Sequence, residues 1–168
     1  SGYGADPAAV GASVGRAKAA GAAGINMEDR LPGESALLPV AEAVARYRAA
    51  ADTGIFVNAR CDTFRGADVA KDGAALVAAT LERARAYADA GAGSLFVPFL
   101  LDPKSIGAIC EGSPLPVNIL RGRGGPTHRE LAALGVARIS HGHQPWAGAM
   151  AWLAAQTAQV LGGEEPDY

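Results

Sequence analysis

The 168-residue sequence predicts an α/β fold in which a parallel sheet is covered by helices. Helical patterns and short apolar strand patterns alternate along the chain, and their connections are short. Two architectures share these features: an open doubly wound sheet and part of a (β/α)8 barrel. In both, ligands gather at the carboxyl ends of the strands. We expect five βα units in one domain, residues 1–162, and a flexible tail, residues 163–168.

Helices are expected where alanine-rich or amphipathic segments meet a capping residue. Asp6 and Pro7 suit the start of the first helix, and Gly54 suits the end of the second. Asp102 opens a short helix through another Asp-Pro pair. The expected helices span residues 6–22, 38–54, 72–92, 102–110, 126–135 and 145–161.

Strands are expected in the apolar or β-rich runs between these helices. They span residues 24–29, 55–64, 94–99, 116–120 and 137–142. The first strand is unusual because Asn26, Glu28 and Asp29 follow an apolar run with no intervening turn residue. If the sheet is parallel, Glu28 and Asp29 stand at the end of the strand where ligands collect.

Composition narrows the class of protein. Hydrophobic residues make up 49% of the chain and charged residues 19%, as in a globular domain with a core. The net charge of −2 and the dispersed arginines give no basic surface for nucleic acid. Cys61 and Cys110 form no disulfide framework, which is typical of reduced thiols in the cytoplasm. No apolar run approaches the roughly 18 residues that cross a bilayer.

Polar side chains recur at the ends of successive strands. Because side chains alternate along a strand, one face of the second strand carries Val57, Ala59 and Cys61, and the other carries Asn58, Arg60 and Asp62. The first set should pack on helices, which makes Cys61 an improbable nucleophile. Glu28 and Asn118 take comparable positions on other strands. Arg suits a carboxylate or phosphate and Glu suits Mg²⁺, although a structural Glu28–Arg60 ion pair is the alternative.

Other candidate residues have simpler explanations. His141 and His143 are expected in a surface loop, with a metal pair as the weaker alternative. The segment RGRGGPTH, residues 121–128, is expected to be a flexible turn rather than an anion site. The aromatic residues Trp146 and Trp152 on the last helix indicate packing in the core or between subunits.

Six segments in order resemble the isocitrate lyase/phosphoenolpyruvate mutase superfamily, in particular its small bacterial members related to 2-methylisocitrate lyase and carboxyphosphonoenolpyruvate phosphonomutase. These segments are SGYG, GAAGINMEDR, VNARCDTF, GAGSLFVPFL, PLPVNIL and LAALGVARISHG. The resemblance implies a (β/α)8 TIM barrel, of which residues 1–162 are the C-terminal portion. It also implies Mg²⁺-dependent cleavage or rearrangement of a C–C or P–C bond through a pyruvate enolate.

The resemblance implies roles for matching positions. Glu28 would hold the metal through its waters, Arg60 would grip a substrate carboxylate or phosphonate, and Asn118 would contact substrate. Gly2, Tyr3 and Gly4 match a loop that follows the family's acidic metal ligands, and we assign them to substrate binding. The family commonly forms homotetramers that exchange the last helix, so we expect a homo-oligomer of this kind.

Three departures from the family limit what carries over. The family's main metal ligands precede the position of Ser1, so the first three βα units are expected to be absent from this chain. The lyase gating loop is replaced by RLPGESALL, which lacks Cys, Lys and His. Phe99 stands where the lyases carry Glu after the sixth-strand Pro. A small α-oxo acid or phosphonate is therefore favoured over a tricarboxylate.

Two alternatives remain beside the enzyme. The changed loop and Phe99 also fit a non-catalytic relative that binds anions. A half-barrel stabilised only by oligomerisation is the third hypothesis, because an open sheet leaves two edges exposed.

Overall fold

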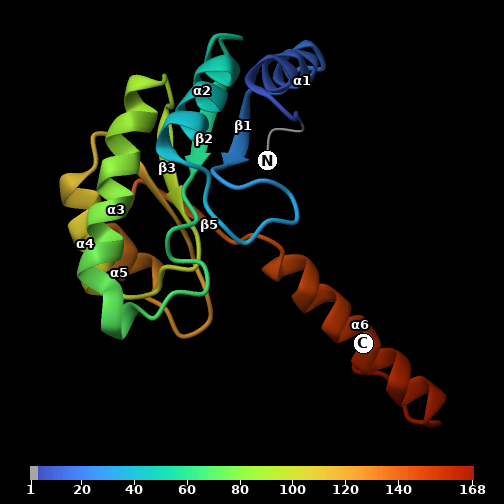
Figure 1. The fold of residues 1–168 in the computed structure, drawn as a ribbon. Coiled ribbons are helices and arrows are strands. Elements are labelled where there is room, and N and C mark those ends of the chain that lie inside the picture. The colour runs from blue at the N-terminus through green and yellow to red at the C-terminus, as the bar shows by residue number, and fades with distance from the viewer. Residues whose placement is uncertain (1–3) are drawn as a thin grey trace.

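The computed structural model describes residues 4–168, so the predicted substrate-binding residues Gly2 and Tyr3 lie outside the described part. Helices and strands alternate from the first element to the last (Figure 1). The helices are α1 (Pro7–Ala19), α2 (Val40–Ala51), α3 (Val69–Asp89), α4 (Pro103–Gly112), α5 (His128–Ala133) and α6 (Gln144–Leu161). The strands are β1 (Gly24–Glu28), β2 (Phe56–Arg60), β3 (Ser94–Val97), β4 (Val117–Leu120) and β5 (Arg138–Ser140).

The strands form one parallel sheet in the order β1-β2-β3-β4-β5. Each strand therefore neighbours the next strand in the chain, with a helix in every connection. Consecutive helices from α1 to α4 also contact one another. This arrangement confirms the predicted parallel α/β architecture. It also brings all five carboxyl ends of the strands to the same edge of the sheet.

Helix starts follow the capping residues. The side chains of Asp6 and Asp102 accept hydrogen bonds from backbone N–H groups of α1 and α4, as the sequence predicts. Hydrogen bonds from Ser105 lower the pKa of Asp102. The start predicted for α3, at residue 72, is wrong: Asp68 caps the helix and α3 begins at Val69.

The core lies between the sheet and its helices. Val57, Ala59 and Cys61 are buried on this side, which confirms the predicted alternation along β2. Burial raises the pKa of the Cys61 thiol, so this cysteine is held as an unreactive packing group.

Helix α6 extends away from the body formed by the sheet and the other helices (Figure 1). Trp146 is 66% exposed and Trp152 is 53% exposed, so a place in the core of this chain is wrong for both. The tail predicted to be flexible folds back along α6. Asp167 there accepts hydrogen bonds from Gln156 and Gln159, and the Tyr168 ring lies 5.9 Å from that of Trp152.

Within residues 4–168, no helix combines the length and apolar character needed to span a membrane.

Candidate functional site

Glu28 and Arg60 meet where β1 and β2 end. The two residues are register partners, so adjacent strands bring them side by side. Arg60 Nη2 lies 3.1 Å from Glu28 Oε2, and the two side chains are 23% and 21% exposed. The pair is thus accessible to a ligand while being supported by the sheet below it.

Asp62 holds the Nε–Nη2 edge of the Arg60 guanidinium, whose Nη2 also faces Glu28. Arg60 Nε and Nη2 donate to its two carboxylate oxygens at 2.6 and 2.9 Å, a bidentate arrangement that sets the plane of the guanidinium. Burial alone would lower the pKa of Arg60, but the hydrogen bonds and charge of Asp62, together with Glu28 and Asp29, outweigh it and raise that pKa. Arg60 therefore stays cationic throughout the physiological range.

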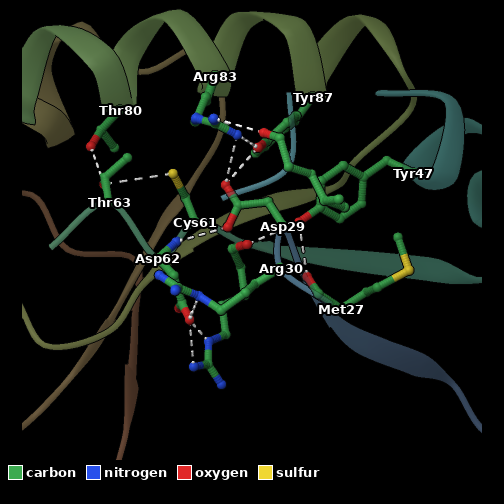
Figure 2. Close-up of polar contacts among 12 residues, drawn as sticks. Met27, Asp29, Arg30, Tyr47, Cys61, Asp62, Thr63, Thr80, Arg83 and Tyr87 are labelled. Atoms are coloured by element: carbon green, nitrogen blue, oxygen red, sulfur yellow. Dashed lines mark hydrogen bonds and ion pairs between the residues drawn. The ribbon is translucent and has the colours of Figure 1, made fainter. Parts of the chain in front are cut away.

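Asp29 points the opposite way from Glu28, into the layer between the sheet and α3. Its carboxylate is fully buried and accepts hydrogen bonds from Tyr87 Oη at 2.6 Å and Arg83 Nη1 at 3.2 Å. Its second oxygen accepts the backbone N–H of Asp62 at 3.0 Å. Figure 2 shows Arg83 and Tyr87 reaching from α3 to this carboxylate. One side chain just after β1 thus holds both α3 and the backbone just after β2.

Tyr47 supports the same strand ends from α2. Its hydroxyl lies 3.0 Å from the carbonyl oxygen of Met27 and 2.9 Å from that of Arg60 (Figure 2). The Tyr47 and Tyr87 rings pack 4.5 Å apart between their centroids. Burial, helped by the charge of Asp29, raises the pKa of Tyr87, so its hydroxyl remains a neutral donor. These contacts fix the backbone that carries Glu28 and Arg60.

Asn118 lies on the register row that contains Glu28 and Arg60. Residue partners run from Arg60 to Phe96 on β3 and from Phe96 to Asn118 on β4. Asn118 is fully buried and its Oδ1 accepts from Ser140 Oγ at 3.1 Å, while its Nδ2 has no hydrogen-bond partner among residues 4–168. An unsatisfied buried donor is unusual, and Asn58 Nδ2 and Arg30 Nε share this state.

Gly4 is the one described residue of the predicted N-terminal loop site. It contacts α2 and α1. Its carbonyl oxygen accepts from Arg46 Nη2 of α2 at 3.0 Å. A Cβ at this position would lie 2.4 Å from the backbone nitrogen of Val10, so the close approach to α1 requires glycine. The role of Gly4 in substrate binding stays a prediction.

Phe99 also lies at the site. From the sequence it was noted only as a departure from the lyase pattern. It follows β3 with a φ of 66°, in the left-handed region that bulky residues rarely adopt. The side chain is 46% exposed, and its ring centroid lies 5.8 Å from Arg60 Cζ. Phe99 therefore adds an aromatic face beside the Glu28–Arg60 pair.

The histidines stand apart from this arrangement. His141 and His143 are exposed, which agrees with the predicted surface loop, and the His141 ring packs on that of His128 at 5.1 Å. Among residues 4–168, no three or more His, Cys, Asp or Glu side chains gather in a way that could hold a metal ion. Two carboxylates lie beside the candidate anion-binding arginine, the fully buried Asp62 and the partly exposed Glu28.

Sequence reasoning found Glu28 and Arg60 but missed what holds them. Asp62 could have been found, because the alternation already placed it on the face of Arg60. Asp29 gave no such signal, since its partners Arg83 and Tyr87 are more than fifty residues away and on a helix.

Known proteins share both the sequence pattern and the fold. The sequence profile of the phosphoenolpyruvate phosphomutase family matches residues 1–161. A candidate phosphonomutase structure from Burkholderia cenocepacia J2315 is 47% identical, with a TM-score of 0.91 over 95% of this chain and 66% of that one. A candidate lyase/mutase from the same organism is 29% identical, with a TM-score of 0.81 over 94% of this chain and 58% of that one.

An uncharacterised protein of Mycobacterium tuberculosis H37Rv is 36% identical over 148 residues, covering 85% of this chain and 53% of the relative. The chain thus spans about half the length of the curated relatives it matches. A 2,3-dimethylmalate lyase structure, 22% identical with a TM-score of 0.80 over 100% of this chain and 60% of that one, shares the fold.

Proposed function

The chain belongs to the phosphoenolpyruvate mutase/isocitrate lyase superfamily, and from this membership we propose a Mg²⁺-dependent enzyme that cleaves or rearranges a C–C or P–C bond. Its substrate is a small α-oxo or 2-hydroxy acid, or a phosphonate, and the reaction passes through a pyruvate enolate. The strands and helices supply the C-terminal portion of a TIM barrel. Family membership supports a lyase or mutase activity, and the metal, the substrate and the enolate mechanism are proposed.

The observation that carries this proposal is the Arg60 guanidinium, held between Glu28 and the buried Asp62 at the carboxyl ends of the strands. Active sites of barrel enzymes lie at that end. A guanidinium fixed in its plane suits bidentate binding of a carboxylate or phosphonate. Because Asp62 and the Asp29 network fix Arg60 beforehand, little conformational entropy remains to be lost when a substrate binds.

Glu28 fits a magnesium site as one oxygen ligand, directly or through coordinated water. Mg²⁺ keeps several waters and is commonly bound through one or two carboxylates plus substrate oxygens. When bound, the ion would supply positive charge where the enolate oxygen develops. Glu28 would hold that side of the site, while the fixed charge of Arg60 orients the substrate anion and stabilises charge as it develops.

Asn118 is suited to the substrate as well, since its buried Nδ2 donor has no partner in the described part of the chain. A substrate carboxylate or carbonyl oxygen would satisfy this donor. Phe99 has a positive φ and a half-exposed apolar ring. This ring stands where the lyase resemblance places a Glu, so the site offers no polar group there and favours a small substrate over a tricarboxylate.

We also propose a homo-oligomer that exchanges α6. The helix leaves the body of its own chain and exposes large apolar side chains, among them Trp146, Trp152, Leu153 and Leu161. Large exposed apolar side chains concentrated on one helix favour an interaction site. Sedimentation of the chain should show a concentration-dependent oligomer, and replacing Trp146 and Trp152 by Ser should shift it to monomer. A wild-type chain that sediments as a monomer at all concentrations would contradict the exchange.

The function is tested by Arg60→Ala in the full chain. Turnover is assayed with Mg²⁺ and a panel that includes phosphonopyruvate and oxaloacetate. Loss of one preorganised donor should lower kcat/KM by about 10²–10³-fold. Arg85→Gln on the exposed face of α3 is the control and should retain wild-type turnover. Equal turnover in Arg60→Ala and wild type would contradict the role of Arg60, and binding without turnover in wild type would favour the non-catalytic alternative.

A further inference from the structure

Phe99 is held in a conformation that needs an explanation. Among residues 4–168 it is the only residue other than glycine with positive φ. A bulky residue stays in the left-handed region only when surrounding contacts outweigh the strain, and such positions cluster at binding and catalytic sites. Phe99 is half exposed, so burial of its ring does not explain the strain.

The ring of Phe99 contacts two guanidinium groups. Arg60 Cζ lies 5.8 Å from its centroid, and Arg65 Cζ lies 5.9 Å from it. Both distances are within the range of a cation–π interaction. The strained backbone thus presents one aromatic ring to two cations at the mouth of the candidate site.

Arg65 is also fixed through its own backbone. Its N–H donates to the carbonyl oxygen of Asp62 at 3.0 Å, and the neighbouring Phe64 is buried, so a short turn anchors Arg65 beside Asp62. Gly66, with a φ of 72°, completes the turn. Arg65 Nη1 lies 3.7 Å from Asp62 Oδ2, yet the side chain is 51% exposed. One part of the guanidinium is held, while the remainder faces solvent.

Charges around Asp62 do not balance. Arg30, Arg60 and Arg65 all approach its carboxylate, and Glu28 adds one further negative charge beside Arg60. Three cations and two anions leave one positive charge in excess. The charge of Asp29 does not offset it, because Asp29 is paired with Arg83. The described part of the mouth therefore carries a net positive charge, which favours an anionic ligand.

We propose that Arg65 is a second anion-binding residue and that Phe99 positions its guanidinium beside that of Arg60. The ligand class is a small acid with two anionic groups, such as an α-oxo acid with a second carboxylate or a phosphonate. Arg60 takes one group and Arg65 takes the other. This inference rests on the proposed function, because it assumes that Arg60 binds substrate.

Calorimetric titration of the full chain tests the assignment, with phosphonopyruvate as the doubly functional probe and pyruvate as the singly functional one, both in Mg²⁺ buffer. Arg65→Gln should weaken phosphonopyruvate binding by about 10–100-fold, as for a lost charge-assisted hydrogen bond, and change pyruvate binding less than about twofold. Phe99→Leu, which keeps apolar bulk without the ring, should weaken phosphonopyruvate binding by about two- to fivefold. Arg85→Gln is the charge-matched control and should change neither.

Each outcome separates the two claims. Equal weakening of both probes by Arg65→Gln, or no weakening of phosphonopyruvate, would overturn the role of Arg65. Unchanged pyruvate binding in Arg60→Ala, with the selective Arg65 effect intact, would overturn the role of Arg60 in the proposed function and leave Arg65 as an anion site. A wild-type chain that binds neither probe would overturn both.

Discussion

Glu28 and Asp29 are neighbouring carboxylates with different surroundings. Glu28 is partly exposed at the mouth of the sheet beside Arg60, whereas Asp29 is fully buried against α3 and satisfied by Tyr87, Arg83 and the Asp62 backbone. The alternation of a strand sends one acid to each side. The same functional group can therefore face a ligand site at one position and stabilise the packing of a helix on the sheet at the next.

The largest effect on stability is expected for Asp29→Ala. The substitution leaves Arg83 and the Tyr87 hydroxyl without their carboxylate in a buried layer, and breaking such a pair costs about 3–5 kcal/mol. Urea unfolding followed by circular dichroism measures the loss. A decrease below about 1 kcal/mol would mean that Asp29 does not hold the framework.

Tyr87→Phe should have a smaller effect of the same kind. It removes the hydroxyl that donates to Asp29 at 2.6 Å and accepts from Arg83 at 2.9 Å, but retains the packing of the ring on Tyr47. We expect a decrease of about 1–3 kcal/mol in the free energy of unfolding. Tyr168→Phe on the exposed tail is the matched control, with an expected change within about 0.5 kcal/mol.

Asp102 offers a third carboxylate, which is half-buried and caps α4. Asp102→Ala should cost about 1 kcal/mol near neutral pH. Because folding lowers the pKa of Asp102, its stabilisation is present above the unfolded-state pKa and is lost as pH falls through the lower folded-state value. The difference between wild type and Asp102→Ala should therefore shrink on acidification below about pH 4. A difference that grows there would contradict the assignment.

Glu28→Gln should have the smallest effect on stability. Its ion pair with Arg60 is partly solvated, and Asp62 still holds the guanidinium, so the free energy of unfolding should change by less than about 1 kcal/mol. Urea unfolding in metal-free buffer measures it. A decrease in the free energy of unfolding as large as that of Asp29→Ala would show that Glu28 and Asp29 stabilise the fold equally, which would contradict the difference between them.

Much of the fold followed from local patterns. Asp-Pro pairs marked the starts of α1 and α4, and the alternation along β2 placed Cys61 on the helix side. These features depend on contacts between residues close in sequence, which a sequence displays directly. The start of α3 was missed because its N-cap, Asp68, lies outside the amphipathic pattern that indicates the helix.

The candidate site was only partly visible in the sequence. Glu28 and Arg60 were expected together because parallel strand ends converge, and the structure pairs them. The Asp29–Arg83–Tyr87 cluster could not be expected, since it depends on the rotation of α3 over the sheet. The strain at Phe99 is a backbone property that its residue type conceals.

Because Glu28 and Asp29 are adjacent, they also affect the register of β1 against β2. Shifting β1 by one residue against β2 would turn Glu28 toward Tyr87 and leave Asp29 facing water, because every side chain changes sides in such a slip. The longer acid would then meet a space shaped for the shorter one. A misaligned β1–β2 pair is thereby penalised before any ligand is present, and correct alignment of β1 also assembles the ligand-facing side.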